Sequence, residues 1–149
     1  MPFILNCVAE DYEDMAQFGA IAVNAVADMN MVFFRKHPQY AVPAVQAGFL
    51  YDPPPVQYRT YNHSICQAPL LLERKVGKCD SLTAWDIAVR RMMGQDAFCG
   101  IKPQGGGLFH VVTFIRKGGR VTEYDSSAEL PRFNGSGCHT NGTDKHCEC

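Results

Sequence analysis

Three side chains in the second half of the chain could together perform nucleophilic catalysis, and the first of them is Cys79. Cys79 follows Gly77 and Lys78 and opens a stretch with the apolar periodicity of a helix. The dipole and unpaired N–H groups of a helix start favour the thiolate, the reactive form of cysteine, and can donate to an oxyanion. The ordinary alternative is a buried and inert cysteine.

The second side chain is His110, which lies within the apolar residues 108–115. Aromatic and β-branched residues in this stretch predict a strand that is apolar on both faces, where a polar side chain is out of place. An imidazole there could take the proton of a thiol, provided that its other ring nitrogen has a partner. A core histidine bonded to the backbone is the alternative.

The third side chain is Asp125, and hairpin geometry relates it to His110. Gly118-Gly119 is a two-residue turn signal between strands over residues 108–115 and 120–125. With that loop the register places Asp125 diagonal to His110 on the same face, with Cβ atoms roughly 5–8 Å apart. A four-residue loop would place the two residues directly opposite, and a three-residue loop would separate them. The alternative for Asp125 is a turn former at the strand end.

Two helices should flank these strands. The first is predicted over residues 11–36, with acidic residues at its start, basic residues at its end, and Pro38 beyond it. Its apolar spacing predicts a buried stripe of Phe18, Ala22, Ala25, Met29 and Phe33. The second is predicted over residues 79–93, with a buried stripe of Leu82, Trp85, Val89 and Met92 and a stop at Gly94.

Residues 38–69 contain many prolines and tyrosines and are predicted to form a long irregular segment. Long loops in compact domains are usually functional or disordered, so this segment is a candidate surface for a protein partner. It also holds the upstream candidates for an oxyanion side chain. Tyr61 lies at a reasonable distance before Cys79, and Gln57, Tyr58 and Gln67 are alternatives.

Length and composition predict one domain over residues 1–132, followed by a polar tail over residues 133–149. A net charge of −1 gives no basic surface for nucleic acid. No secretory signal and no membrane-spanning run are expected, which favours a cytoplasmic location. The seven cysteines are therefore expected as free thiols or ligands rather than disulfides, with Cys7, Cys66 and Cys99 as small apolar residues.

The tail is the other candidate site, because it concentrates thiols and imidazoles. Its candidate zinc ligands are Cys138, His139, His146, Cys147 and Cys149. These side chains suit zinc, although their spacing is not that of a standard zinc motif. The alternatives are a tail without metal, or a disulfide such as Cys138 to Cys147.

The three catalytic candidates occur in motifs that resemble the transglutaminase-like branch of the papain-like cysteine enzymes. The motifs are Gly77-Lys78-Cys79-Asp80-Ser81-Leu82, then Phe109-His110-Val111-Val112, then Glu123-Tyr124-Asp125-Ser126, over about 50 residues. The resemblance implies an α+β fold in which the nucleophile helix packs on an antiparallel sheet. It assigns Cys79 as nucleophile, His110 as base and Asp125 as orienting group, without a cofactor. Ser126 departs from the family, where proline is frequent.

Two functions from different classes follow as hypotheses. The first is a thiol-dependent peptidase or amidase that works through a thioester, with acyl transfer as a variant of the same chemistry. The second is an inactive transglutaminase-like module with a structural or interaction role, for instance in a phage virion or its assembly. Acidic residues after the cysteine resemble small bacterial and tailed-phage members, which adds a virion-associated location to the expectations.

Overall fold

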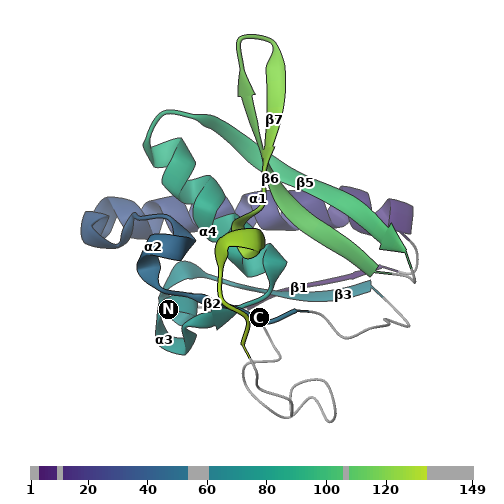
Figure 1. Cartoon of the computed structure of the whole chain (residues 1–149), viewed down its shortest axis with the longest axis horizontal. Helices are drawn as coiled ribbons and strands as arrows, with labels where there is room; N and C mark the ends of the chain where they lie inside the picture. The colour runs from purple at the N-terminus through teal and green to yellow at the C-terminus, as the bar shows by residue number, and fades with distance from the viewer. Residues whose placement is uncertain (1–3, 10–11, 54–60, 106–107, 134–149) are drawn as a thin grey trace.

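A computed structural model describes residues 4–9, 12–53, 61–105 and 108–133 (Figure 1). For residues 4–9, 12, 13, 15, 61–63, 104, 105 and 108 it describes the backbone alone. The structure combines helices with mainly antiparallel strands, which confirms the predicted α+β class. The zinc candidates of the tail, from Cys138 to Cys149, lie outside the described residues.

The elements follow the chain in a mixed order. The helices are α1 (Tyr12–Lys36), α2 (Ala44–Ala47), α3 (Ala68–Arg74) and α4 (Cys79–Met92), with 3-10 turns η1 (Pro38–Tyr40) and η2 (Ser126–Glu129). The strands are β1 (Ile4–Ala9), β2 (Leu50–Tyr51), β3 (Tyr61–Cys66), β4 (Val76–Gly77), β5 (Asp96–Gly105), β6 (Leu108–Lys117) and β7 (Arg120–Tyr124). They form the sheets β1-β3, β2-β4 and β5-β6-β7.

Helix α4 is the centre of the core. The side chains from Cys79 to Val89 are all buried, because α1, β5, β6 and η2 surround the helix (Figure 1). The rings of Phe34 and Phe49 pack edge-on against Trp85, each with centroids 4.8 Å away. The predicted stripe is therefore correct for Leu82, Trp85 and Val89, whereas Met92 is exposed near the helix end.

Helix α1 begins and ends close to the predicted bounds, but its buried face was predicted only in part: Ala22 is buried as predicted, whereas Ala25, Met29 and Phe33 are half-buried. The buried residues of α1 are Gly19, Ala22, Val23, Val26, Ala27, Asn30 and Phe34. Phe18 is exposed, as are Ile21 and Val32. Helix α1 has apolar residues on all of its faces, so the spacing of these residues does not determine which face packs against the core. The segment Ala16–Lys36 of α1 is long and apolar enough to cross a membrane, although no such segment was expected. The core helix of a soluble protein can have the same length and composition.

The predicted hairpin is present in β6 and β7. Lys117 lies opposite Arg120, so the loop contains only Gly118 and Gly119. Their φ angles of 58° and 79° are both positive, as a two-residue type I′ turn requires. Strand β5, which was not predicted, pairs with the other edge of β6.

Residues 38–69 contain more regular structure than predicted. Strand β3 pairs antiparallel with β1, and neither strand was expected. Helix α3 starts at Ala68, with Pro69 in its first turn. A proline is accepted there because the first helical N–H groups have no partner within the helix. The proline therefore marks a helix start rather than a break.

The cysteines were only partly predicted. Cys79 and Cys99 are free and buried, as expected of Cys99. Cys66 instead takes part in a disulfide, so its assignment as a small apolar residue with a free thiol is wrong. The backbone N–H of Cys66 donates to Oγ of Ser81 at 2.9 Å, which ties the end of β3 to the first turn of α4. The side chain of Cys7 lies outside the described part of the chain.

Candidate active site

Cys79 is the first residue of α4, and the loop before it is held tightly. A Cβ atom at Gly77 would lie 2.9 Å from Cδ1 of Leu71, so any other residue where β4 leads into the helix would force the buried Leu71 side chain to shift. The ammonium of Lys78 lies 2.7 Å from Oδ2 of Asp52, whose side chain is buried. These contacts fix the backbone on which the thiol is mounted.

The sulfur of Cys79 lies against the edge of β6. Strand β7 ends at Tyr124, opposite Thr113, so it does not pair with the part of the β6 edge that precedes Thr113. The start of α4 packs against that part. The backbone N–H of Val111 donates to the Cys79 sulfur, and Oγ1 of Thr83, one helical turn later, donates to the Val111 carbonyl at 3.2 Å. The nucleophile candidate is therefore placed beside the residue that follows His110.

His110 and Asp125 form the predicted pair. Nε2 of His110 lies 2.7 Å from Oδ2 of Asp125, and Oδ1 of the same carboxylate accepts the N–H of Ser127 at 3.0 Å. A carboxylate only accepts hydrogen bonds, so Nε2 carries the proton and Nδ1 keeps a lone pair. Asp125 thus fixes the tautomer in which His110 can act as a base.

The protonation state of Cys79 differs from expectation. Burial, followed by the neighbouring carboxylates of Asp80 and Asp125, raises the pKa of the thiol to about 12, against the lowering effect of the Val111 and Asp80 N–H groups. The N–H group of Asp80 at the helix start does lower the pKa of the thiol, as predicted, but burial outweighs it, so the net shift does not favour the thiolate. Desolvation of a charge outweighs the helix dipole, which acts only over the first turn. The resting site holds a neutral thiol.

The hydrogen bonds in the first turn of α4 indicate which backbone N–H group is left to bind an oxyanion. The N–H of Ser81 donates to Oδ1 of Asp80 at 2.6 Å, and the N–H of Leu82 donates to the Lys78 carbonyl. The N–H of Asp80 is directed at the Cys79 sulfur. The amide of Cys79 itself is the donor that remains in this turn. The side chain of Tyr61, the predicted oxyanion residue, lies outside the described part of the chain, and its backbone is in β3.

A pocket of about 280 Å³ opens onto the His110–Asp125 pair. It is lined by Tyr51, His110, Asp125, Ser127, Ala128, Leu130 and Arg132. Cys79 is only 3% exposed and does not contribute to the lining. Side chains around the thiol must therefore move before it can meet a substrate. Tyr51 and Arg132 were not predicted, because no local signal in the sequence connects them to the motifs.

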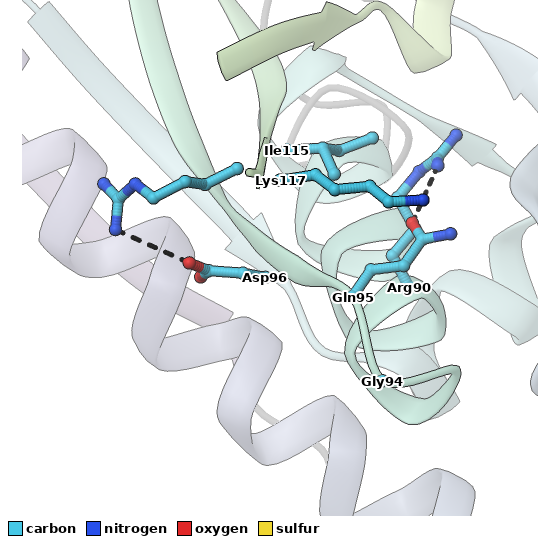
Figure 2. Close-up of a pocket in the computed structure, with 7 residues that line it drawn as sticks. Arg90, Gly94, Gln95, Asp96, Ile115 and Lys117 are labelled. Carbon is cyan, nitrogen blue, oxygen red and sulfur yellow. Dashed lines mark hydrogen bonds and ion pairs between the residues drawn. The ribbon is translucent and has the colours of Figure 1, made fainter. Parts of the chain in front are cut away.

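A second cavity, of about 380 Å³, lies at the other end of α4 (Figure 2). It is lined by Arg90, Gly94, Gln95, Asp96, Ile115, Arg116 and Lys117. Arg90 donates to the Gln95 amide oxygen at 3.1 Å, and Arg116 lies 3.5 Å from Asp96. The lining includes no nucleophile and no histidine, so this cavity is not a candidate for the predicted chemistry.

A metal site has no support in the structure's described residues, which contain no group of three or more His, Cys, Asp or Glu side chains suited to a metal ion. Comparison with known proteins gives no assignment either. No protein-family model, curated protein or solved structure matches this chain.

Proposed function

We propose that the chain is a thiol-dependent hydrolase of peptide or amide bonds, built on a transglutaminase-like arrangement of Cys79, His110 and Asp125. The observation that supports it most is the 2.7 Å contact between His110 and Asp125, on the strand whose edge receives the Cys79 sulfur. A nucleophile, a base and an orienting carboxylate in this relation are what acyl transfer through a thioester requires.

The neutral thiol determines the order of events in this mechanism. The Cys79 sulfur attacks the carbonyl carbon while its proton passes to Nδ1 of His110, and the Cys79 amide donates to the oxyanion. His110 then protonates the leaving amine, and a thioester remains. Water attacks the thioester with His110 as base, which releases the acid and restores the thiol. Asp125 stabilises the imidazolium in both halves of the reaction.

Hydrolysis is the preferred outcome, because nothing in the sequence indicates a dedicated site for an amine. An amine in place of water would make the same intermediate a cross-link. Peptide, including cell-wall peptide, is the substrate class that we infer. The reaction needs no metal or organic cofactor.

The test is the pH dependence of alkylation at each thiol by iodoacetamide, followed by peptide mapping. A thiol whose pKa is raised by burial, without a base, should react with a rate that rises about tenfold per pH unit through the alkaline range. Base assistance by His110 should add a component at neutral pH, which His110→Ala removes. Cys99, also buried and with a raised pKa, is the internal control.

Two results would contradict the proposal. One is a Cys79 rate at neutral pH that matches that of Cys99. The other is a Cys79 rate that does not change in His110→Ala, although the variant keeps the thermal unfolding midpoint of the wild type. Either result would remove His110 as base.

The second candidate function is an inactive structural or interaction module. The observation that favours it is the burial of Cys79, whose side chain is only 3% exposed and whose thiol has a pKa raised by that burial. Residues 38–69 would then be the contact surface. Substitution of Cys79 by alanine should abolish function in an enzyme and leave a structural role unchanged, which separates the two candidates.

A further inference from the structure

Arg132 is a cation beside the His110–Asp125 pair that the proposed mechanism does not use. Its side chain is exposed and lines the same pocket. Among the described residues no carboxylate forms an ion pair with it, whereas the nearby ammonium of Lys78 is matched by Asp52. Both oxygens of Asp125 are already engaged, by His110 and by the N–H of Ser127. The pocket therefore contains a guanidinium that forms no ion pair with any described carboxylate, including that of Asp125 in the same lining.

The backbone of Arg132 is fixed relative to the nucleophile. Arg132 lies opposite Tyr51, because the N–H of Tyr51 donates to the Pro131 carbonyl and the N–H of Phe133 donates to the Tyr51 carbonyl. Tyr51 in turn lies opposite Gly77 in the β2-β4 pair. Neighbouring strands are about 4.8 Å apart, so the Cα atoms of Arg132 and Gly77 are separated by roughly 10 Å.

That spacing suits recognition of one substrate residue beside the reacting bond. Gly77 precedes Cys79 by two residues, and one peptide residue spans about 3.5 Å. A group one or two residues from the scissile carbonyl can therefore reach the guanidinium. Guanidinium binds carboxylates in a two-pronged geometry that a lysine or an amide does not reproduce.

We propose that Arg132 binds a carboxylate of the acyl donor, so that the substrate is an acidic peptide or one with a free α-carboxylate close to the scissile bond. This inference rests on the proposed function for the identity of the reacting thiol. It makes Arg132 a specificity-determining residue rather than a participant in bond making. The two sources of the carboxylate share one chemistry, and the experiment below distinguishes them.

The experiment compares alkylation of Cys79 by iodoacetate, which carries a carboxylate, and by iodoacetamide, which is neutral. We expect the ratio of the two rates to fall roughly three- to fivefold in Arg132→Gln and to recover in part in Arg132→Lys. The ratio in the wild type should also fall as ionic strength rises. Lys117→Gln, which removes one positive charge in the second cavity, should leave both rates unchanged.

The outcomes separate this inference from the proposed function. Equal ratios in the wild type and in Arg132→Gln overturn the role of Arg132, whatever His110→Ala does to the iodoacetamide rate. Loss of His110 dependence with an intact Arg132 effect overturns the catalytic mechanism and leaves the carboxylate site standing. If neither reagent reaches Cys79 in the folded protein, the pocket does not lead to the thiol and the inference fails.

Protection from iodoacetamide identifies the source of the carboxylate. N-acetylglutamic acid α-amide presents an acidic side chain, N-acetylalanine presents an α-carboxylate, and N-acetylglutamine amide is the neutral control. We expect one of the two acids to slow the labelling of Cys79 in the wild type, with protection lost in Arg132→Gln. Protection by the neutral control to the same extent, or by neither acid at millimolar concentration, would contradict recognition of a carboxylate.

Discussion

Asp125 contacts His110 at 2.7 Å through one carboxylate oxygen and the N–H of Ser127 through the other. The same side chain therefore orients the imidazole and caps the turn η2 that follows the hairpin. Both contacts require an acceptor, since each partner presents an N–H group. This double use makes the site sensitive to the difference between a carboxylate and an amide.

The first prediction follows from that difference. Asp125→Asn offers one acceptor oxygen and one NH₂ group, so it can keep either the His110 contact or the Ser127 cap, but not both. We expect the His110-dependent alkylation rate to fall on the order of 10²-fold, or the unfolding free energy to fall by about 1 kcal/mol. Glu129→Gln is the matched control. An Asn variant with both quantities unchanged would refute the double role.

The Gly118-Gly119 turn between β6 and β7 provides a prediction about stability. Gly119 has a φ of 79° and no atom within 4 Å of an added Cβ, so substitution tests backbone strain alone. Gly119→Ala should lower the unfolding free energy by about 1–2 kcal/mol in urea denaturation. Gly118→Asn should be nearly neutral, because asparagine accepts a positive φ at this turn position. Equal losses for the two variants would argue against a type I′ turn.

The Lys78–Asp52 ion pair should behave as a buried pair. Lys78→Met removes the ammonium from a carboxylate whose side chain is only 1% exposed, and should cost about 3 kcal/mol. The double variant Lys78→Met/Asp52→Asn should recover much of that loss, because no charge is left in the core. Chemical denaturation of the four proteins of this cycle measures the coupling. Additive losses would show that the two side chains act independently.

Asp86 should make stability depend on pH. Its Oδ1 accepts the N–H of Ala44 at 2.9 Å, and burial raises the pKa of the carboxyl. A raised pKa means that the folded state binds the proton more tightly than the unfolded state does. The contribution of Asp86 to the unfolding free energy is therefore complete below the ordinary pKa of the carboxyl, and it declines as the pH rises through the pKa in the folded state. Asp86→Asn keeps the acceptor without the charge.

The stability of Asp86→Asn, relative to the wild type, should therefore increase from pH 4 to pH 7.5. Asp86→Ala loses the acceptor and should be less stable at both pH values, by about 1–3 kcal/mol. Unfolding free energies at the two pH values provide the measurement. A difference between wild type and Asp86→Asn that is constant with pH would contradict a raised pKa.

The buried thiols predict instability in alkali. In the folded state, burial raises the pKa values of Cys79 and Cys99 above the ordinary thiol value of 9.0. As the pH rises, the unfolded state therefore releases these two protons at a lower pH than the folded state does. The unfolding free energy should then fall above about pH 9, by up to 1.4 kcal/mol per pH unit for each thiol. The variant Cys79→Ala/Cys99→Ala should have a flatter profile between pH 8 and 10. An identical slope in the two proteins would argue against both shifts.

Short-range features of this protein could be read from the sequence. The Gly118-Gly119 turn fixed the register of β6 and β7, and with it the approach of Asp125 to His110, because a two-residue loop allows one pairing. The helix that begins at Cys79 and stops before Gly94 followed from its end residues and apolar period. Each of these depends on interactions between residues close together in the chain.

The tertiary structure decided the features that depend on residues far apart in sequence. It selected the buried face of α1, paired β1 with β3 and aligned Arg132 with Tyr51 and Gly77. It also determined the state of the Cys79 thiol, since a helix dipole is set by local structure, whereas desolvation depends on everything that packs around the sulfur. The approach of Asp125 to His110 was thus readable from local pattern, whereas the burial of the Cys79 thiol was determined by packing.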